Sequence, residues 1–156
     1  EFSRGLSGMD ADSVVESLLA SARRVIPHAH AGVVLVWNSK TEHLVPRAVS
    51  GYADNDSMMK INYRLGEALP GTAFLNRKSR RVDEINFPRD YNLNTENLAH
   101  YRQATGGRLP VSCLIVPIVS AEQNLGLLVL DNFNTTAAFR PDDETLLVSL
   151  SQQVAL

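Results

Sequence analysis

The stretch VSCLIVPIVSAEQNLGLLVLDNF (111–133) holds two apolar runs that are separated by a short turn. Neither run, 111–119 or 125–133, alternates between apolar and polar residues, so we expect both faces of each predicted strand to be covered. The residues between the runs are few enough to join the strands as an antiparallel hairpin. AGVVLVW (31–37) has the same apolar character. The three runs therefore predict the centre of a sheet that is buried on both sides.

Helices and further strands are predicted on either side of this centre. Apolar residues recur at helical spacing over 10–26, and Pro27 cannot continue that helix because it lacks an N–H. Pro46 cannot donate to a sheet, so its strand should be bulged there or lie at an edge. A last helix begins at Pro141, and no residue that favours a helix end precedes Leu156, so we expect a truncated helix. The remaining predictions are strands over 43–50, 59–65 and 81–85 and short helices over 70–77 and 95–104.

The composition is that of one globular domain. The chain has 156 residues, of which 44% are hydrophobic, enough apolar material for a single core. We predict one domain over 10–156, preceded by a linker or expression remnant over 1–9. Fifteen Lys and Arg against 17 Asp and Glu argue against nucleic acid as a partner. No apolar run reaches the roughly 18–20 residues of a membrane span, and no secretory signal is visible. A single cysteine excludes an intramolecular disulfide, so we expect a reducing, cytoplasmic setting and no membrane partner.

Residues 86–110, called the lid from here on, are predicted to cover one face of the sheet. The terminal helices can cover only the other face, and a long loop inside a compact domain is often a binding element. Aromatic rings can cover a planar ligand, and arginine can hold a carboxylate or phosphate. We therefore predict a small-molecule pocket beneath the lid; the alternative is that the polar lid residues face water. The predicted ligand-binding residues are Tyr91, His100, Tyr101, Arg102, Cys113 and Ile115.

Three segments of the sequence resemble the GAF domain family. LGEALPGTAFLNRKSRRVDEI (65–85) is similar to the family's glycine-containing segment that leads into a helix and a short strand, with Ala68 where a glycine is common. CLIVPIVSAEQNLGLLVLDN (113–132) resembles its central hairpin, and FRPDDETLLVSLSQQVAL (139–156) its closing helix. The resemblance implies an α+β fold of the GAF/PAS type. An antiparallel sheet of five or six strands would carry the terminal helices on one face and lid loops and short helices on the other.

The resemblance also offers a motif of cyclic-nucleotide-binding members, which consists of Asn-Lys or Asn-Arg, then Phe, then Asp-Glu. Its matching residues are Asn132, Phe139, Asp143 and Glu144. Phe133 stands where the motif needs a cation, so the ion pair of those members cannot form in the usual way. The structural alternative is that Phe139 packs in the core while the two acids complement a helix N-terminus.

Cys113 and His100 are the residues through which other branches of the family act. Members that reduce free methionine sulfoxide use several cysteines, whereas this chain has one. Cys113 lies in an apolar strand, where cysteine usually acts as a small hydrophobe. A single axial histidine is sufficient for haem, so a haem sensor through His100 is a further alternative. His28 and His30 have no third ligand nearby in the sequence, so we expect no metal site.

The function that these features predict is that of a non-catalytic sensory domain. It would bind an unidentified small molecule beneath the lid and relay a conformational signal through its terminal helices. Its partners would be an effector in the same full-length chain, such as a histidine kinase, a cyclase or a transcription regulator, and a second copy in a homodimer. The alternative is a ligand-free module for dimerisation and signal relay. Catalysis is not expected, because no nucleophile with an adjacent base is visible.

Overall fold

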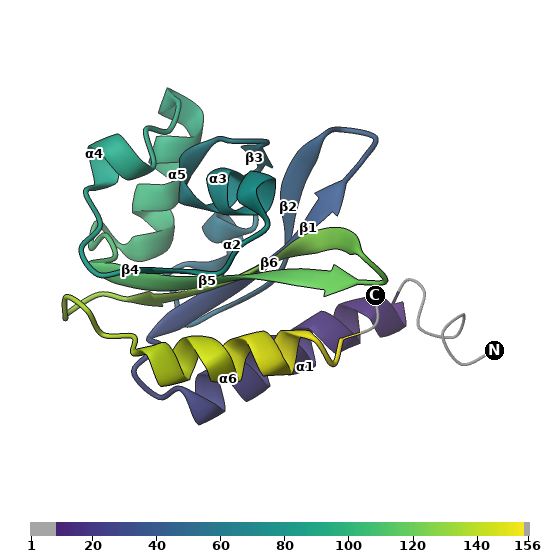
Figure 1. Cartoon of the computed structure of the whole chain (residues 1–156). Coiled ribbons are helices and arrows are strands. Elements are labelled where there is room, and N and C mark those ends of the chain that lie inside the picture. The colour runs from purple at the N-terminus through teal and green to yellow at the C-terminus, as the bar shows by residue number, and fades with distance from the viewer. Residues whose placement is uncertain (1–8, 155–156) are drawn as a thin grey trace.

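The computed structural model describes residues 9–154 and shows a six-stranded sheet with helices on both faces (Figure 1). The strand order is β3-β2-β1-β6-β5-β4, and every neighbouring pair is antiparallel. The two-sided apolar runs thus occupy β1, β6 and β5 at the centre, as predicted. The linker predicted over 1–9 lies outside the described residues, apart from Met9 in the first helix. The strands are β1 (Ala31–Asn38), β2 (His43–Ser50), β3 (Tyr63–Arg64), β4 (Arg80–Val82), β5 (Ser112–Ser120) and β6 (Gln123–Asn132).

Two helices cover one face of the sheet, α1 (Met9–Val25) and α6 (Pro141–Ser151). They lie side by side beneath the strands, as the prediction of paired terminal helices required (Figure 1). The buried residues of α1 and α6 pack against every second residue of the central strands, including Leu128 and Leu130 of β6. Within the described residues the last helix ends at Ser151. The truncation of this helix stays a prediction.

Four short helices cover the opposite face, called the lid face from here on. They are α2 (Asn55–Met58), α3 (Ala68–Asn76), α4 (Phe87–Asp90) and α5 (Thr95–Thr105). The lid contributes α4 and α5, but residues 52–76 supply as many buried side chains to this face, among them Met58, Ile61 and Phe74. The prediction that the lid alone covers the second face was therefore wrong. The lid also packs tightly, because its apolar residues point inward while its polar residues face water.

Sequence patterns were least informative about the shortest helices and strands. The strand predicted over 59–65 is reduced to two residues, Tyr63 and Arg64. The helices α2 and α4 are too short to show a helical period. Each is instead set by a capping side chain: Asp54 accepts a hydrogen bond from the Ser57 N–H, and Asn86 accepts one from the Arg89 N–H.

Two features of β2 and β6 adjust the central strands. The register between β1 and β2 shifts by one residue beside Pro46, which confirms the predicted bulge. Gly126 lies where β6 crosses β1 closely: a Cβ atom there would overlap the carbonyl oxygen of Leu35. Only glycine, which has no Cβ atom, fits at this position.

Within the described residues, each helix is too short or too polar to span a bilayer.

Candidate functional site

Asp131 is a buried carboxyl group on the lid face of β6. Leu127 and Val129 precede it on the same face because side chains alternate along a strand. The side chain is almost fully buried, at 1% exposure. Its Oδ2 accepts a hydrogen bond from the Tyr52 hydroxyl at 2.5 Å, while its Oδ1 has no partner among the described residues. An ionisable group is thus placed in the core with one of its two carboxyl oxygens unpaired.

The surroundings of Asp131 disfavour its charge. Burial raises the pKa of Asp131 to about 7, although the hydrogen bond from Tyr52 acts in the opposite direction. No lysine, arginine or histidine of residues 9–154 forms an ion pair with it. Burial, and then the charge of Asp131, raises the pKa of Tyr52 well above its ordinary range. The carboxyl group is therefore close to its midpoint of ionisation near neutral pH.

Three aromatic rings of the lid pack against one another in the buried cluster of the same face. Phe87 and Tyr91 of the α4 region stack with ring centroids 4.7 Å apart, and Tyr101 of α5 lies 4.9 Å and 5.3 Å from them. Tyr101 is fully buried, and its hydroxyl has no hydrogen-bond partner among the described residues. Burial, followed by the charge of Asp131, raises the pKa of Tyr101 well above its ordinary range, although the neighbouring Tyr91 hydroxyl acts in the opposite direction. Two buried oxygens, Asp131 Oδ1 and Tyr101 Oη, thus remain unpaired on the lid face.

The structure brings together four of the six predicted ligand-binding residues. Tyr91, Tyr101, Cys113 and Ile115 all belong to the buried cluster of the lid face. The prediction that Arg102 reaches the interior was wrong: its side chain is exposed, because Tyr101 takes the inward position on that turn of α5. His100 is half-buried and lies outside the cluster. The space expected between sheet and lid is filled by the aromatic rings.

Asp131 and Tyr52 are the site residues that the sequence interpretation missed. The available signal was an acidic residue at the end of the apolar run LGLLVLD (125–131), where the strand was already predicted to be covered on both faces. Tyr52 follows β2 in a bend and carries no comparable signal. Its contact with Asp131 joins residues 79 positions apart in the chain, so it emerges only when the strands are assembled.

The four motif residues hold the end of the sheet to α6. The Asn132 amide donates to the His28 carbonyl oxygen at 2.8 Å and accepts from the N–H groups of Asn134 and Thr135. Asp143 Oδ2 lies 3.0 Å from His28 Nε2. The remaining two residues are similarly engaged: Phe139 is buried among the terminal-helix residues, and Glu144 accepts from Ser79 and Arg81 of the β4 region. These contacts favour the structural interpretation of the motif.

The Cys113 thiol lies within the buried cluster on β5. Burial, and then the charge of Asp131, raises its pKa well above the ordinary value. A thiol held in its neutral form is a poor nucleophile. Among residues 9–154, no three His, Cys, Asp or Glu side chains gather as metal ligands would.

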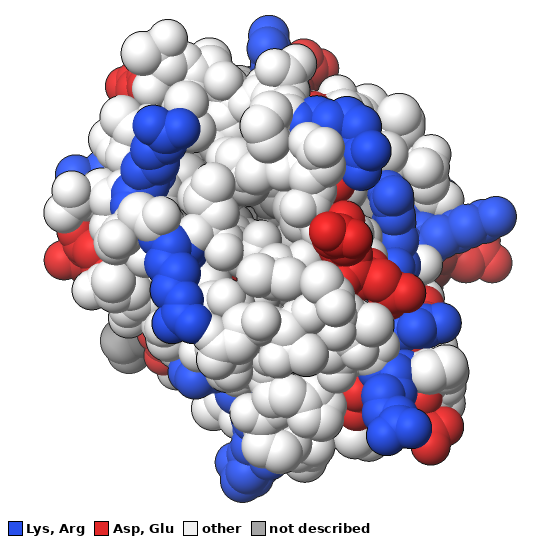
Figure 2. All heavy atoms as spheres, turned by 90° about the vertical axis from the view of Figure 1, so that its left-hand side faces the viewer, with Lys and Arg blue, Asp and Glu red and all other residues white. Residues whose placement is uncertain are grey.

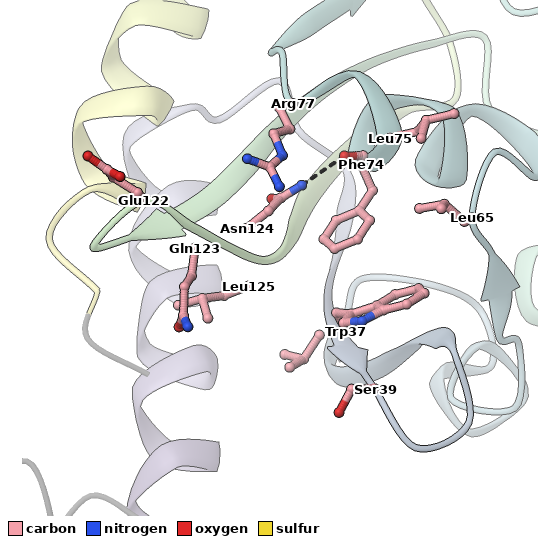
Figure 3. Close-up of a pocket in the computed structure, with 11 residues that line it drawn as sticks. Trp37, Ser39, Leu65, Phe74, Leu75, Arg77, Glu122, Gln123, Asn124 and Leu125 are labelled. Atoms are coloured by element: carbon pink, nitrogen blue, oxygen red, sulfur yellow. Dashed lines mark hydrogen bonds between the residues drawn. The ribbon is translucent and has the colours of Figure 1, made fainter.

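A groove lies at the other end of β6 from Asp131, beside the β5–β6 turn (Figure 3). It has a volume of about 690 Å³. Trp37 and Phe74 stack at its wall with centroids 5.1 Å apart, and the Asn124 amide donates to the Phe74 carbonyl oxygen at 2.8 Å. Leu65 and Leu75 on its border are about half exposed. No sequence pattern pointed to this groove.

The surface beside the lid carries charges of both signs. On the side of the molecule where α4 lies, lysine and arginine side chains alternate with acidic side chains around an uncharged centre (Figure 2). Arg89 of α4 is paired with Asp90 at 2.9 Å. This face therefore presents no continuous basic stripe of the kind that follows a nucleic-acid backbone.

The six-stranded antiparallel sheet, with paired terminal helices on one face and a lid of short helices on the other, is an α+β fold. A family model described as "GAF domain" matches residues 8–156. The chain therefore belongs to the GAF domain family, as the sequence resemblance predicted.

Solved structures with the same fold come from several kinds of protein. The GAF domain of a phosphoenolpyruvate-protein phosphotransferase from Coxiella burnetii is 18% identical, with a TM-score of 0.75 over 94% of this chain and 81% of that one. A GAF domain/HD domain protein from Geobacter sulfurreducens is 15% identical, with a TM-score of 0.73 over 98% and 93%. A free methionine-R-sulfoxide reductase from Neisseria meningitidis is 15% identical, with a TM-score of 0.70 over 94% and 76%. No curated protein sequence matches the chain. At these identities the likeness establishes the fold alone.

Proposed function

We propose that this GAF domain is a non-catalytic, cytoplasmic sensor that binds a small molecule between the lid and the lid face of the sheet. The observation that carries the proposal is the pair of buried, unpaired oxygens, Asp131 Oδ1 and Tyr101 Oη. A buried polar atom without a partner destabilises a protein by about 1–3 kcal/mol. A core that served packing alone would replace these groups with apolar ones. A bound ligand that donates hydrogen bonds to them would remove this cost.

Ligand entry requires the lid to move, because aromatic rings fill the space beneath it. Few contacts outside the core hold α5 in place. The Asp54 N–H donates to the Ala104 carbonyl oxygen at 2.9 Å, and the Asn97 amide donates to the Asn62 carbonyl oxygen at 3.2 Å. Since most of the attachment is by packed rings, a ligand that replaces ring contacts can shift the lid between two arrangements.

The contacts of β6 supply a route from this site to the terminal helices. The carbonyl oxygen of Asp131 accepts from the His30 N–H at 2.9 Å, in the connection that follows α1. The next residue, Asn132, holds the His28 carbonyl oxygen, and the His28 ring contacts Asp143 in the first turn of α6. A displacement of Asp131 would therefore change the contacts of both terminal helices. An effector in the same full-length chain would receive the signal from them.

The absence of catalysis is part of this proposal. The only cysteine of the sequence, Cys113, is buried in a strand and held as a neutral thiol. A redox cycle through a disulfide needs a second thiol. The likeness to a methionine sulfoxide reductase therefore bears on the fold of this chain and not on its chemistry.

A melting screen against nucleotides, haem, small anions and small amines tests the sensor proposal. A ligand specific for the native state raises stability by about 2.7 kcal/mol at 100 times its Kd. For a domain of this size we expect an increase in Tm of roughly 5–10 °C. The substitution Asp131→Asn should abolish the response, whereas Glu84→Gln, which changes an exposed carboxylate, should preserve it. A Tm that none of these compounds changes would contradict the proposal.

The second candidate is a ligand-free module for dimerisation and relay, and the packed lid favours it. A groove of about 370 Å³ runs between α1 and α6 and has Val14, Leu18 and Leu150 on its walls. A second copy that placed the same face here would form an isologous contact.

Sedimentation tests the dimer directly. If the terminal helices form the contact, the domain sediments as a dimer at high concentration, and Val14→Arg weakens the dimer by at least about tenfold because it buries a charge in the groove. Ala20→Arg places the same charge on an exposed position of α1 outside the groove and should leave the dimer intact. Monomeric wild-type protein, or equal effects of the two variants, would exclude this interface.

A further inference from the structure

The unpaired atoms of the lid face define what a ligand must present to them. An ionised carboxylate accepts hydrogen bonds and donates none, so a group that pairs with Asp131 Oδ1 has to be a donor. The other oxygen of this carboxyl group already accepts from the Tyr52 hydroxyl. Tyr101 Oη can accept a second hydrogen bond from the same ligand group or donate one to a neighbouring atom. Asp131 Oδ1 therefore has a place for a donor, and no described residue of the protein donates to it.

The charge balance of the lid face favours a cationic donor. A buried carboxylate is costly unless an opposite charge accompanies it. The ion pairs among residues 9–154 involve other acids, and Arg102, the lid cation that was predicted to reach the interior, is exposed. An anionic ligand would meet a second negative charge, and a neutral one would leave the charge of Asp131 unbalanced. A ligand cation supplies the missing charge and the missing donor together.

The aromatic rings of the lid face also favour a cation. Phe87, Tyr91 and Tyr101 contact one another on the lid side, and Tyr52 and Tyr63 belong to the same buried cluster. The face of an aromatic ring attracts a cation, and the attraction increases when water is excluded. The rings also supply apolar surface for a carbon chain. Because they fill the space beneath the lid, a ligand has to be small.

We propose that the ligand of this site is a small organic ammonium compound whose N–H donors reach Asp131 Oδ1 and Tyr101 Oη and whose carbon chain packs among the lid rings. The inference rests on the proposed sensor function and names the chemical class of its ligand. The raised pKa of Asp131 is consistent with it, because an ammonium group would stabilise the carboxylate that burial disfavours. Binding near neutral pH should then release a proton from Asp131.

Three small probes test the ligand class. Butylammonium, n-butanol and butyrate each contain four carbon atoms and differ in charge, so they can be compared at pH 8 and constant ionic strength by titration calorimetry. We expect saturable binding of butylammonium alone. Asp131→Asn should weaken it at least about tenfold, and Tyr101→Phe, which removes only the hydroxyl, by roughly threefold to tenfold. Arg102→Ala, on the exposed side of the same helix, should bind as the wild type does.

The release of a proton from Asp131 on binding provides a second readout. A residue with a merely structural role would not change it. Calorimetry in buffers with different ionisation enthalpies should show proton release on butylammonium binding at pH 7 and almost none at pH 9. Binding of n-butanol or butyrate without butylammonium would overturn the ammonium proposal while leaving the sensor function intact. Failure of all three probes would also overturn it. The sensor function itself would fail only if the wider melting screen were negative too.

Discussion

The variant Asp131→Asn is expected to lose a pH dependence of stability that the wild-type domain has. The pKa of Asp131 is about 7 in the folded protein, compared with the usual value of 3.8. Between these two values the folded state binds more protons than the unfolded state, so the free energy of unfolding falls as the pH rises and levels off above about 7. This single group should reduce wild-type stability by about 2–3 kcal/mol between pH 5 and pH 8.

Asparagine has no charge to bury, and its amide oxygen can still accept the hydrogen bond from Tyr52. We therefore expect Asp131→Asn to be close to the wild type or somewhat less stable at pH 5 and more stable at pH 8. Urea denaturation at both pH values measures the difference. The exposed-site variant Glu84→Gln should keep the wild-type pH profile. Parallel profiles for the wild type and Asp131→Asn would show that Asp131 is not the group responsible.

The substitution Gly126→Ala should reduce stability by about 3 kcal/mol or more, or prevent folding, because it adds a methyl group where there is no space. The new Cβ would overlap the backbone carbonyl of Leu35 and lie 3.1 Å from the Cα of Val36. Backbone atoms of a central strand cannot turn aside as a flexible side chain can. The pairing of β1 with β6, on which both cores depend, would have to separate.

Gly107→Ala is the matched control for this effect. Gly107 has a φ of +82°, which alanine adopts only with strain, but a Cβ atom there would meet nothing within 4 Å. Its cost should be about 1 kcal/mol from backbone strain alone. Thermal or urea denaturation of the two variants separates steric overlap from strain. Equal losses of stability would contradict the argument that close strand packing requires Gly126.

The sequence alone was sufficient for the central sheet and its terminal helices. Apolar runs without alternation can be stable only where both faces are covered, so 31–37, 111–119 and 125–133 had to be central strands. Pro46 indicated the bulge in β2, because proline has no N–H to donate to a neighbouring strand. The lid was located by its length, and Tyr91, Tyr101, Cys113 and Ile115 all lie in the buried cluster of the lid face. These features are determined by properties of neighbouring residues.

Only the tertiary structure decided the polar chemistry of the lid face. Whether a lid residue faces inward depends on how α5 rotates against the sheet, and this rotation buries Tyr101 while it exposes Arg102. The partner of Asp131 is Tyr52, from a bend that β2 and α2 bring across the sheet. Likewise, His28 and Asp143 meet although 115 positions separate them. Local sequence patterns do not indicate such pairs, because the partner of a buried polar group is determined by strand order and helix packing.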